Sequence, residues 1–169
     1  DDVNDEGGLF GYDSRTWGMV GGVDTTFEGG DVLVGVAVGW AESDIDSNRS
    51  GDGSDVESFR LTGYGSMKRD VWFFDSALHY THHEFESTRS LRVGALSGTA
   101  EADYSGDEYG AEVRLGQLQQ YRDWIVEPSV SVGGGVLVRE SYGEKGLSDA
   151  LSPLGLRLGK RTYESGRVE

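Results

Sequence analysis

The stretch DVLVGVAVGWAESDID, residues 31–46, contains the longest uninterrupted apolar run of the chain. That run, from Val32 to Trp40, is far shorter than the roughly 20 residues of a membrane helix. Valine alternates in it with glycine or alanine, so a strand would carry valine on one face and almost no side chain on the other. A tilted strand crosses the hydrocarbon in about 9–11 residues. The run therefore predicts a membrane-crossing strand whose two faces meet different surroundings.

Composition excludes several classes of protein. The 169 residues suffice for one domain, and 30 acidic against 15 basic residues give a net charge of −15. Nucleic acid is not an expected partner, because phosphate neutralisation requires clustered lysine and arginine. The chain has no cysteine, which excludes disulfides, thiol catalysis and cysteine-ligated zinc. No signal peptide opens the chain, and no apolar segment reaches the length of a membrane helix.

Two-residue alternation recurs along the sequence, whereas helical periodicity is nearly absent. It predicts about seven strands, near residues 16–27, 32–43, 57–67, 71–85, 108–116, 124–138 and 151–159. The polar residues 84–107 are expected to extend both flanking strands beyond the apolar band. Short turns alternate with longer polar loops, which is typical of an antiparallel up-and-down transmembrane β-barrel. The predicted fold class is therefore all-β.

The two rows of each predicted strand differ in chemistry. The lipid-facing row is predicted to contain Trp17, Val32, Val34, Val36, Val38, Trp40, Trp72, Phe74, Leu78, Val130 and Val132. The lumen-lining row is predicted to contain Gly18, Gly22, Gly35, Ala37, Gly39, Arg60, Glu112, Arg114, Glu127, Arg139 and Arg157. Aromatic residues fall near the ends of the apolar rows, as in interfacial girdles. A soluble β-sandwich also alternates, but its outer face would carry more lysine and glutamate than glycine and alanine.

The order of seven blocks resembles the autotransporter (type V secretion) β-domain. The blocks are GYDSRTWGMVGGVDTTF, VLVGVAVGWAESDID, ESFRLTGYGS, WFFDSALHYTHHEFESTR, GDEYGAEVRLG, VEPSVSVGG and LSPLGLRLG, over about residues 11–160. The resemblance implies a twelve-stranded outer-membrane barrel of a Gram-negative bacterium that supports the export and surface anchoring of an N-terminal passenger. It also implies a helix threaded through the lumen, which small residues such as Gly133 and Gly135 would accommodate.

The same resemblance gives the expected domain boundaries. Residues 1–10 are predicted to be a linker remnant, and residues 11–169 a partial β-domain corresponding to strands two to eight. The chain is therefore expected to be a fragment that lacks the signal peptide, passenger, threading helix, first strand, last strands and terminal aromatic residue. A sheet with two open edges cannot sit in hydrocarbon, where every backbone group needs a partner, so the fragment is not expected to secrete anything alone.

No pattern in the sequence predicts an enzyme, a cofactor or a metal site. The lumen charges are expected to form a structural or pore-lining network, with Glu127 paired to a neighbouring arginine. Oxygen donors at Asp44, Asp46, Asn48, Ser50, Asp52 and Asp55 echo a calcium loop. The position that requires glycine is Arg49, however, and the final ligand is aspartate, so a solvated loop is the preferred interpretation. On a strand His79 and His83 would share the lumen side while His82 faces outward, which does not suit a three-ligand metal site.

The expected partners are outer-membrane lipid, the chain's own passenger segment in the lumen and the outer-membrane insertion machinery. Two alternatives remain open at this point. One is a small outer-membrane barrel with a structural or adhesive role, and the other is a soluble acidic β-sandwich that acts as a binding module.

Overall fold

The computed structural model describes residues 2–3, 12–47, 52–122 and 124–169. Its main element is an antiparallel eight-stranded sheet with the order β1-β2-β3-β4-β5-β6-β9-β12, so the all-β, up-and-down prediction is confirmed. The sheet strands are β1 (Asp2–Val3), β2 (Tyr12–Phe27), β3 (Val32–Ser47), β4 (Gly53–Arg69), β5 (Trp72–Val93), β6 (Leu96–Gln117), β9 (Ser129–Arg139) and β12 (Arg161–Val168). Over the described residues no second large sheet covers either face, which excludes the two-sheet sandwich.

Two small ribbons complete the described chain. The elements outside the main sheet are η1 (Glu28–Gly30), β7 (Gln119–Tyr121), β8 (Trp124–Val126), β10 (Tyr142–Gly143), η2 (Ser152–Leu154) and β11 (Arg157–Leu158). β7 pairs with β8, and β10 pairs with β11. None of the helices in the described part of the chain has the length and apolar character needed to span a membrane.

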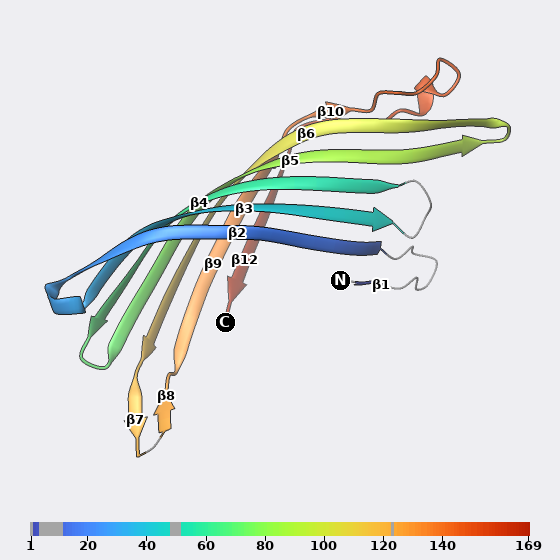
Figure 1. Cartoon of the computed structure of the whole chain (residues 1–169). Coiled ribbons are helices and arrows are strands. Elements are labelled where there is room, and N and C mark those ends of the chain that lie inside the picture. Colours follow the sequence, from blue (N-terminus) through green and yellow to red (C-terminus); the bar gives the residue numbers. More distant parts are fainter. Residues whose placement is uncertain (1, 4–11, 48–51, 123) are drawn as a thin grey trace.

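The strands extend to different lengths at the two ends of the sheet. At one end, β2 and β3 are joined by η1, where Gly29 and Gly30 supply positive φ, and β4 and β5 are joined by Asp70 and Val71. At the other end, β5 and β6 continue far past the apolar rows (Figure 1), with unbroken pairing from Trp72↔Gln117 to Val93↔Leu96. The turn between these two strands consists of Gly94 and Ala95. This confirms that residues 84–107 extend the two flanking strands.

The predicted seventh strand, residues 151–159, is wrong. Those residues form η2 and β11 outside the main sheet, and the last long strand is β12. Pro153 lacks the N–H group that a sheet ladder needs, and β12 carries no apolar row that would identify it. Arg157, predicted to line the lumen, consequently lies on β11 opposite Gly143.

The predicted sixth strand, residues 124–138, is interrupted at Glu127 and Pro128. The Gln117 N–H still donates to the Pro128 carbonyl at 3.0 Å, so β8 continues the register of β9 without belonging to the same sheet. The linker prediction for residues 1–10 falls on residue 1 and residues 4–10, which lie outside the described part, and on β1, which pairs with β2. The boundary at residue 10 stays a prediction.

Candidate functional site

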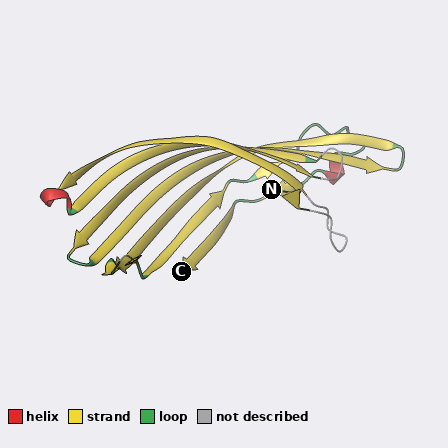
Figure 2. Cartoon of the chain, turned by 60° about the horizontal axis from the view of Figure 1, so that its bottom comes forward, coloured by secondary structure: helices red, strands yellow, loops and turns green. Residues whose placement is uncertain are grey.

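The candidate site is the pair of faces of the main sheet, which is strongly bowed (Figure 2). Directly opposed residues share a face, and Val36 stands opposite Val23 on β2 and Gly63 on β4. Val34, Val36 and Val38 are exposed, whereas the small residues between them are half-buried although they carry little or no side chain. The valine face is therefore convex and the glycine face concave.

The register assigns the predicted residues to these faces. All residues predicted to face lipid lie on the convex face. The predicted lumen residues on the concave face are Gly18, Gly22, Gly35, Ala37, Gly39, Arg60, Glu112, Arg114 and Arg139. Glu127 follows β8 and reaches this face through its contact with Arg114.

The convex face carries an apolar belt with aromatic borders. From Val32 to Trp40 the belt runs about 26 Å along β3, at roughly 3.3 Å per residue, which suits a tilted crossing of the hydrocarbon. At one border Trp17 meets Trp40 edge-to-face at 4.6 Å, and the Trp40 indole N–H donates to Glu57 at 2.6 Å. At the other border Trp72 is about half exposed. Aromatic rings with a polar handle at the belt edge are typical of membrane interfaces.

Large side chains on the concave face lie over glycines of the neighbouring strand. The Tyr64 ring covers Gly35, and its hydroxyl donates to Asp24 two strands away at 3.0 Å. The His79 ring covers Gly110 in the same way. The expected empty space beside Gly35 is therefore partly filled, and a Cβ at this position would require the Tyr64 ring to move.

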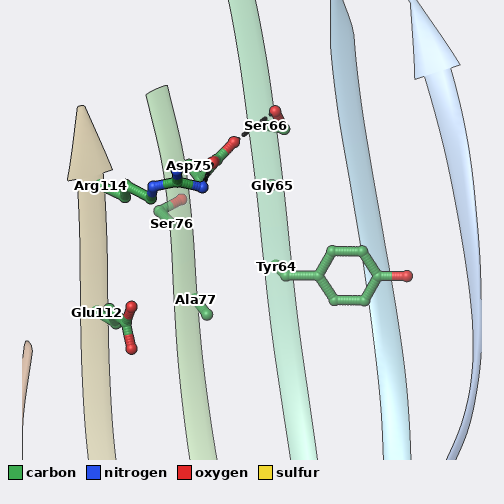
Figure 3. A pocket seen from close by; sticks show the side chains of 8 residues that line it. All are labelled: Tyr64, Gly65, Ser66, Asp75, Ser76, Ala77, Glu112 and Arg114. Carbon is green, nitrogen blue, oxygen red and sulfur yellow. Dashed lines mark hydrogen bonds and ion pairs between the residues drawn. The ribbon is translucent and has the colours of Figure 1, made fainter. Parts of the chain in front are cut away.

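Charged side chains on the concave face form pairs across strands. Arg114 donates to Glu127 at 2.6 Å and lies 4.0 Å from Asp75, which accepts a hydrogen bond from Ser66 at 2.6 Å. Figure 3 shows the Asp75 and Arg114 part of this group, around a cavity that Glu112 also lines. A second pair joins Glu112 to Arg167 of β12 at 3.6 Å.

Glu108 is the centre of a polar cluster on the concave face. Its carboxylate lies 3.0 Å from His79, 3.4 Å from His83 and 3.5 Å from Arg60. The Arg60 Nε–H also donates to the hydroxyl of Thr81, a residue that is only 2% exposed. Glu108 thus connects side chains of β4, β5 and β6, so the middle of this face is fixed by polar contacts rather than by apolar packing.

Comparison with known proteins decides what kind of sheet this is. The Autotransporter beta-domain family profile matches residues 1–169. The chain belongs to the autotransporter β-domain family. This family membership assigns the chain to the outer membrane of Gram-negative bacteria.

Individual relatives agree with this assignment. A solved structure, the translocator domain of the autotransporter NalP from Neisseria meningitidis, matches 96% of this chain and 53% of its own with a TM-score of 0.79 and 16% identity, which supports the barrel fold. The extracellular serine protease of Serratia marcescens is 26% identical over 148 residues, 83% of this chain and 13% of that protein. Outer membrane protein B of Rickettsia rickettsii is 35% identical over 71 residues, 41% of this chain and 4% of that protein. The chain thus spans a small part of the curated relatives it matches.

The histidines of this β-domain divide between the faces. His79 and His83 share the concave face, as the alternation predicts, whereas His82 lies on the convex face and contacts Asp107 at 2.8 Å. Asp107 also accepts a hydrogen bond from Tyr80 at 2.7 Å. His82 therefore belongs to the polar border of the belt.

Three of the six oxygen donors of the calcium-like segment lie on strands rather than in a loop. Asp44 and Asp46 lie on β3, and Asp55 lies on β4 opposite Asp44. Asn48 and Ser50 fall outside the described residues. No group of three or more acidic or histidine side chains that could hold a metal occurs in residues 2–3, 12–47, 52–122 and 124–169.

Asp75, Glu108 and Arg167 are among the charged residues of the concave face that sequence analysis missed. Alternation already puts Asp75 on the row of His79, and Glu108 on the row of Glu112. Their partners lie on other strands, however, and depend on the cross-strand register. Only Arg167 gave no signal, because β12 was not recognised as a strand.

Proposed function

We propose that the concave face lines the lumen of a closed outer-membrane barrel, that the convex belt faces lipid, and that the domain supports the export and surface anchoring of an N-terminal passenger. The observation that carries the proposal is the separation of side chains by face, which gives apolar rows with aromatic borders on one face and small, polar or paired charged residues on the other. Backbone groups at both sheet edges need partners in hydrocarbon, so the membrane form is a closed barrel.

The paired charges suit a lumen wall that holds a passenger segment. Arg114 with Glu127, Arg167 with Glu112, and Arg60 with Glu108 neutralise one another across strands, so no strong local field of one sign opposes a passing chain. The passenger segment in the lumen and the outer-membrane insertion machinery are the expected protein partners.

We propose further that the β-domain itself is not an enzyme and requires no cofactor. Its polar side chains pair with one another, and the chain carries no cysteine nucleophile, phosphate-binding loop or serine elbow. The protease activity in the name of the Serratia relative is that of a whole protein, of which the chain matches 13%.

The face assignment is tested by placing arginine on either side of the same part of the sheet. Val36→Arg puts a charge near the middle of the belt, where it costs about 2–4 kcal/mol in a bilayer. Thr62→Arg is the matched control, because Thr62 lies on the adjacent strand beside Gly63 but on the concave face, where water or polar groups can solvate the charge.

The measurement uses the full-length protein that carries this chain. We expect Val36→Arg to reduce the heat-modifiable, folded fraction in outer-membrane preparations, and Thr62→Arg to leave most of it. Equal losses for the two variants would remove the face assignment. A folded unsubstituted barrel whose passenger is not reached by external protease on intact cells would instead remove the export function.

A further inference from the structure

The segment between β9 and β12, residues 140–160, does not extend freely from the sheet. We call it the strap. It begins beside the edge of β6, where the Glu140 N–H donates to the Ser105 carbonyl at 2.9 Å. Further on, Glu101 and Lys145 exchange two backbone hydrogen bonds of 3.0 and 2.8 Å. The strap then folds back over the hairpin formed by the outer parts of β5 and β6 (Figure 1).

The tip of the strap is buried against small residues. Leu151 is 1% exposed, and its side chain lies over Gly98, where an added Cβ would be 2.8 Å from Leu151 Cδ1. Ala100 and Ala102 share that face of β6 and are almost fully buried. Glycine and alanine at alternate positions therefore let the strap approach the hairpin closely.

A nearly buried ion pair holds the middle of the strap. Arg89 of β5 donates to both carboxylate oxygens of Glu144, at 2.9 and 2.6 Å, and the Leu156 N–H donates to the same carboxylate at 2.8 Å. The Glu144 side chain is only 7% exposed. Bidentate arginine–carboxylate pairs with a further backbone donor are among the stronger polar contacts in proteins. We call this pair the latch.

Aromatic stacking fixes the base of the strap. Tyr142 stacks on Tyr104 of β6 with centroids 4.2 Å apart, and Tyr104 stacks on Phe85 of β5 at 4.8 Å. The Arg139 guanidinium lies 5.1 Å from the Tyr142 ring centroid. The strap is thus attached at its base, middle and tip to the same hairpin.

All three attachments lie on the face that continues the concave face. Pairing between β5 and β6 is unbroken from the belt to the tip, so Phe85 and Arg89 alternate in phase with His83 and with Ala77 deeper in the sheet. Tyr104 and Gly98 alternate in phase with Glu108 in the same way. In a closed barrel this face surrounds the lumen, and the end with long loops is the extracellular one. The strap therefore projects from the wall over the extracellular mouth.

We propose that the strap is a gate that narrows the extracellular mouth of the lumen and is kept in place by the Arg89–Glu144 latch. The inference rests on the proposed function, since it requires the concave face to be the lumen. Releasing the latch frees the strap from the hairpin and widens the mouth.

The test compares variants of the full-length protein reconstituted in planar bilayers and in vesicles. Glu144→Gln removes the charge of the latch, whereas Glu140→Gln is the matched control, because Glu140 also pairs within the strap, with Lys160 at 2.8 Å, but is about half exposed. Glu144→Gln is expected to raise single-channel conductance and to speed trypsin cleavage after Lys145 by about tenfold, because cleavage follows the population of the open form. Glu140→Gln is expected to change neither.

A disulfide cross-link that holds the strap against β6 provides a second test. Glu101 and Lys145 form a hydrogen-bonded antiparallel pair, with Cα atoms about 5.5 Å apart in such pairs, so cysteines there can form a disulfide in a chain that otherwise has none. In the oxidised Glu101→Cys/Lys145→Cys background, Glu144→Gln should return to the conductance of the unsubstituted protein.

Two results would overturn the gate. One is faster cleavage at unchanged conductance, and the other is no change in either. Conductance and cleavage are both measured on barrels that remain heat-modifiable. These results therefore differ from a failure of the proposed function, in which the unsubstituted protein forms no barrel or exports nothing.

Discussion

Gly22 and Gly21 are neighbours on β2 that face opposite sides of the sheet. A Cβ added to Gly22 would lie 2.7 Å from the Val36 carbonyl oxygen and 3.0 Å from Ala37 Cβ. A Cβ added to Gly21 would meet nothing within 4 Å. Gly22→Ala is therefore expected to destabilise the barrel, while Gly21→Ala is expected to be neutral or slightly stabilising.

The magnitude follows from the backbone contact. At 2.7 Å the new carbon is about 0.6 Å inside the roughly 3.3 Å at which C–H···O contacts between strands normally lie. Neither the carbonyl nor Ala37 has a side-chain torsion that could move away, so β2 and β3 must separate locally. Overpacking of this kind costs about 1–3 kcal/mol. The loss of unfolded-state freedom on replacing glycine is common to both variants and cancels in their comparison.

The assay is urea unfolding of the full-length protein's barrel in lipid vesicles, with free energies obtained by linear extrapolation. Gly22→Ala should unfold at a lower midpoint than Gly21→Ala, with the same slope. If Gly22→Ala proved as stable as Gly21→Ala, the close approach of β2 and β3 on the concave face would be refuted.

Further outcomes concern the ion pairs and the strap. Glu127→Lys should lower the free energy of unfolding of the barrel by no more than about 1 kcal/mol, since both partners of the ion pair are partly exposed. The double exchange Arg114→Glu/Glu127→Lys should restore it. The pKa of Glu144 is held below its ordinary 4.5, mainly by the hydrogen bonds from Arg89, so the latch stabilises the strap fully above that pH and less as pH falls through the lowered pKa. Amide exchange in the strap should be constant from about pH 7 to 5, after correction for intrinsic rates, and faster in acid; invariance in acid would contradict this. Leu151→Ala should speed trypsin cleavage of the strap at neutral pH, losing about 2–4 kcal/mol of packing, whereas exposed Leu154→Ala should not.

The strands of the belt could be predicted because the local pattern and the final environment agree. In residues 32–40 the period of two gives both the strand and its faces, and the apolar row on one face is uninterrupted. β12 had no such signal. Its sequence RTYESGRV lacks an apolar row, while the leucines of residues 151–159 imitate one.

The contacts of the candidate site depended on register instead. Alternation puts Arg114 on the glycine face, but its partners Glu127 and Asp75 are selected by which strands lie beside it and at what offset. Only part of the role of Gly35 could be predicted from the sequence. The absence of a side chain can be read from the residue, whereas the Tyr64 ring that occupies the space comes from the next strand.

The sequence by itself determined the all-β fold class, the two faces of each belt strand and the family of this domain, because each rests on periodicity or on order along the chain. Only the tertiary structure decided which charges pair, which glycines are covered and that residues 140–160 fold back over the β5–β6 hairpin. The physical reason is that Glu144 and Arg89 are 55 positions apart, and that a charged residue in a polar loop carries no local sign of the partner that will bury it.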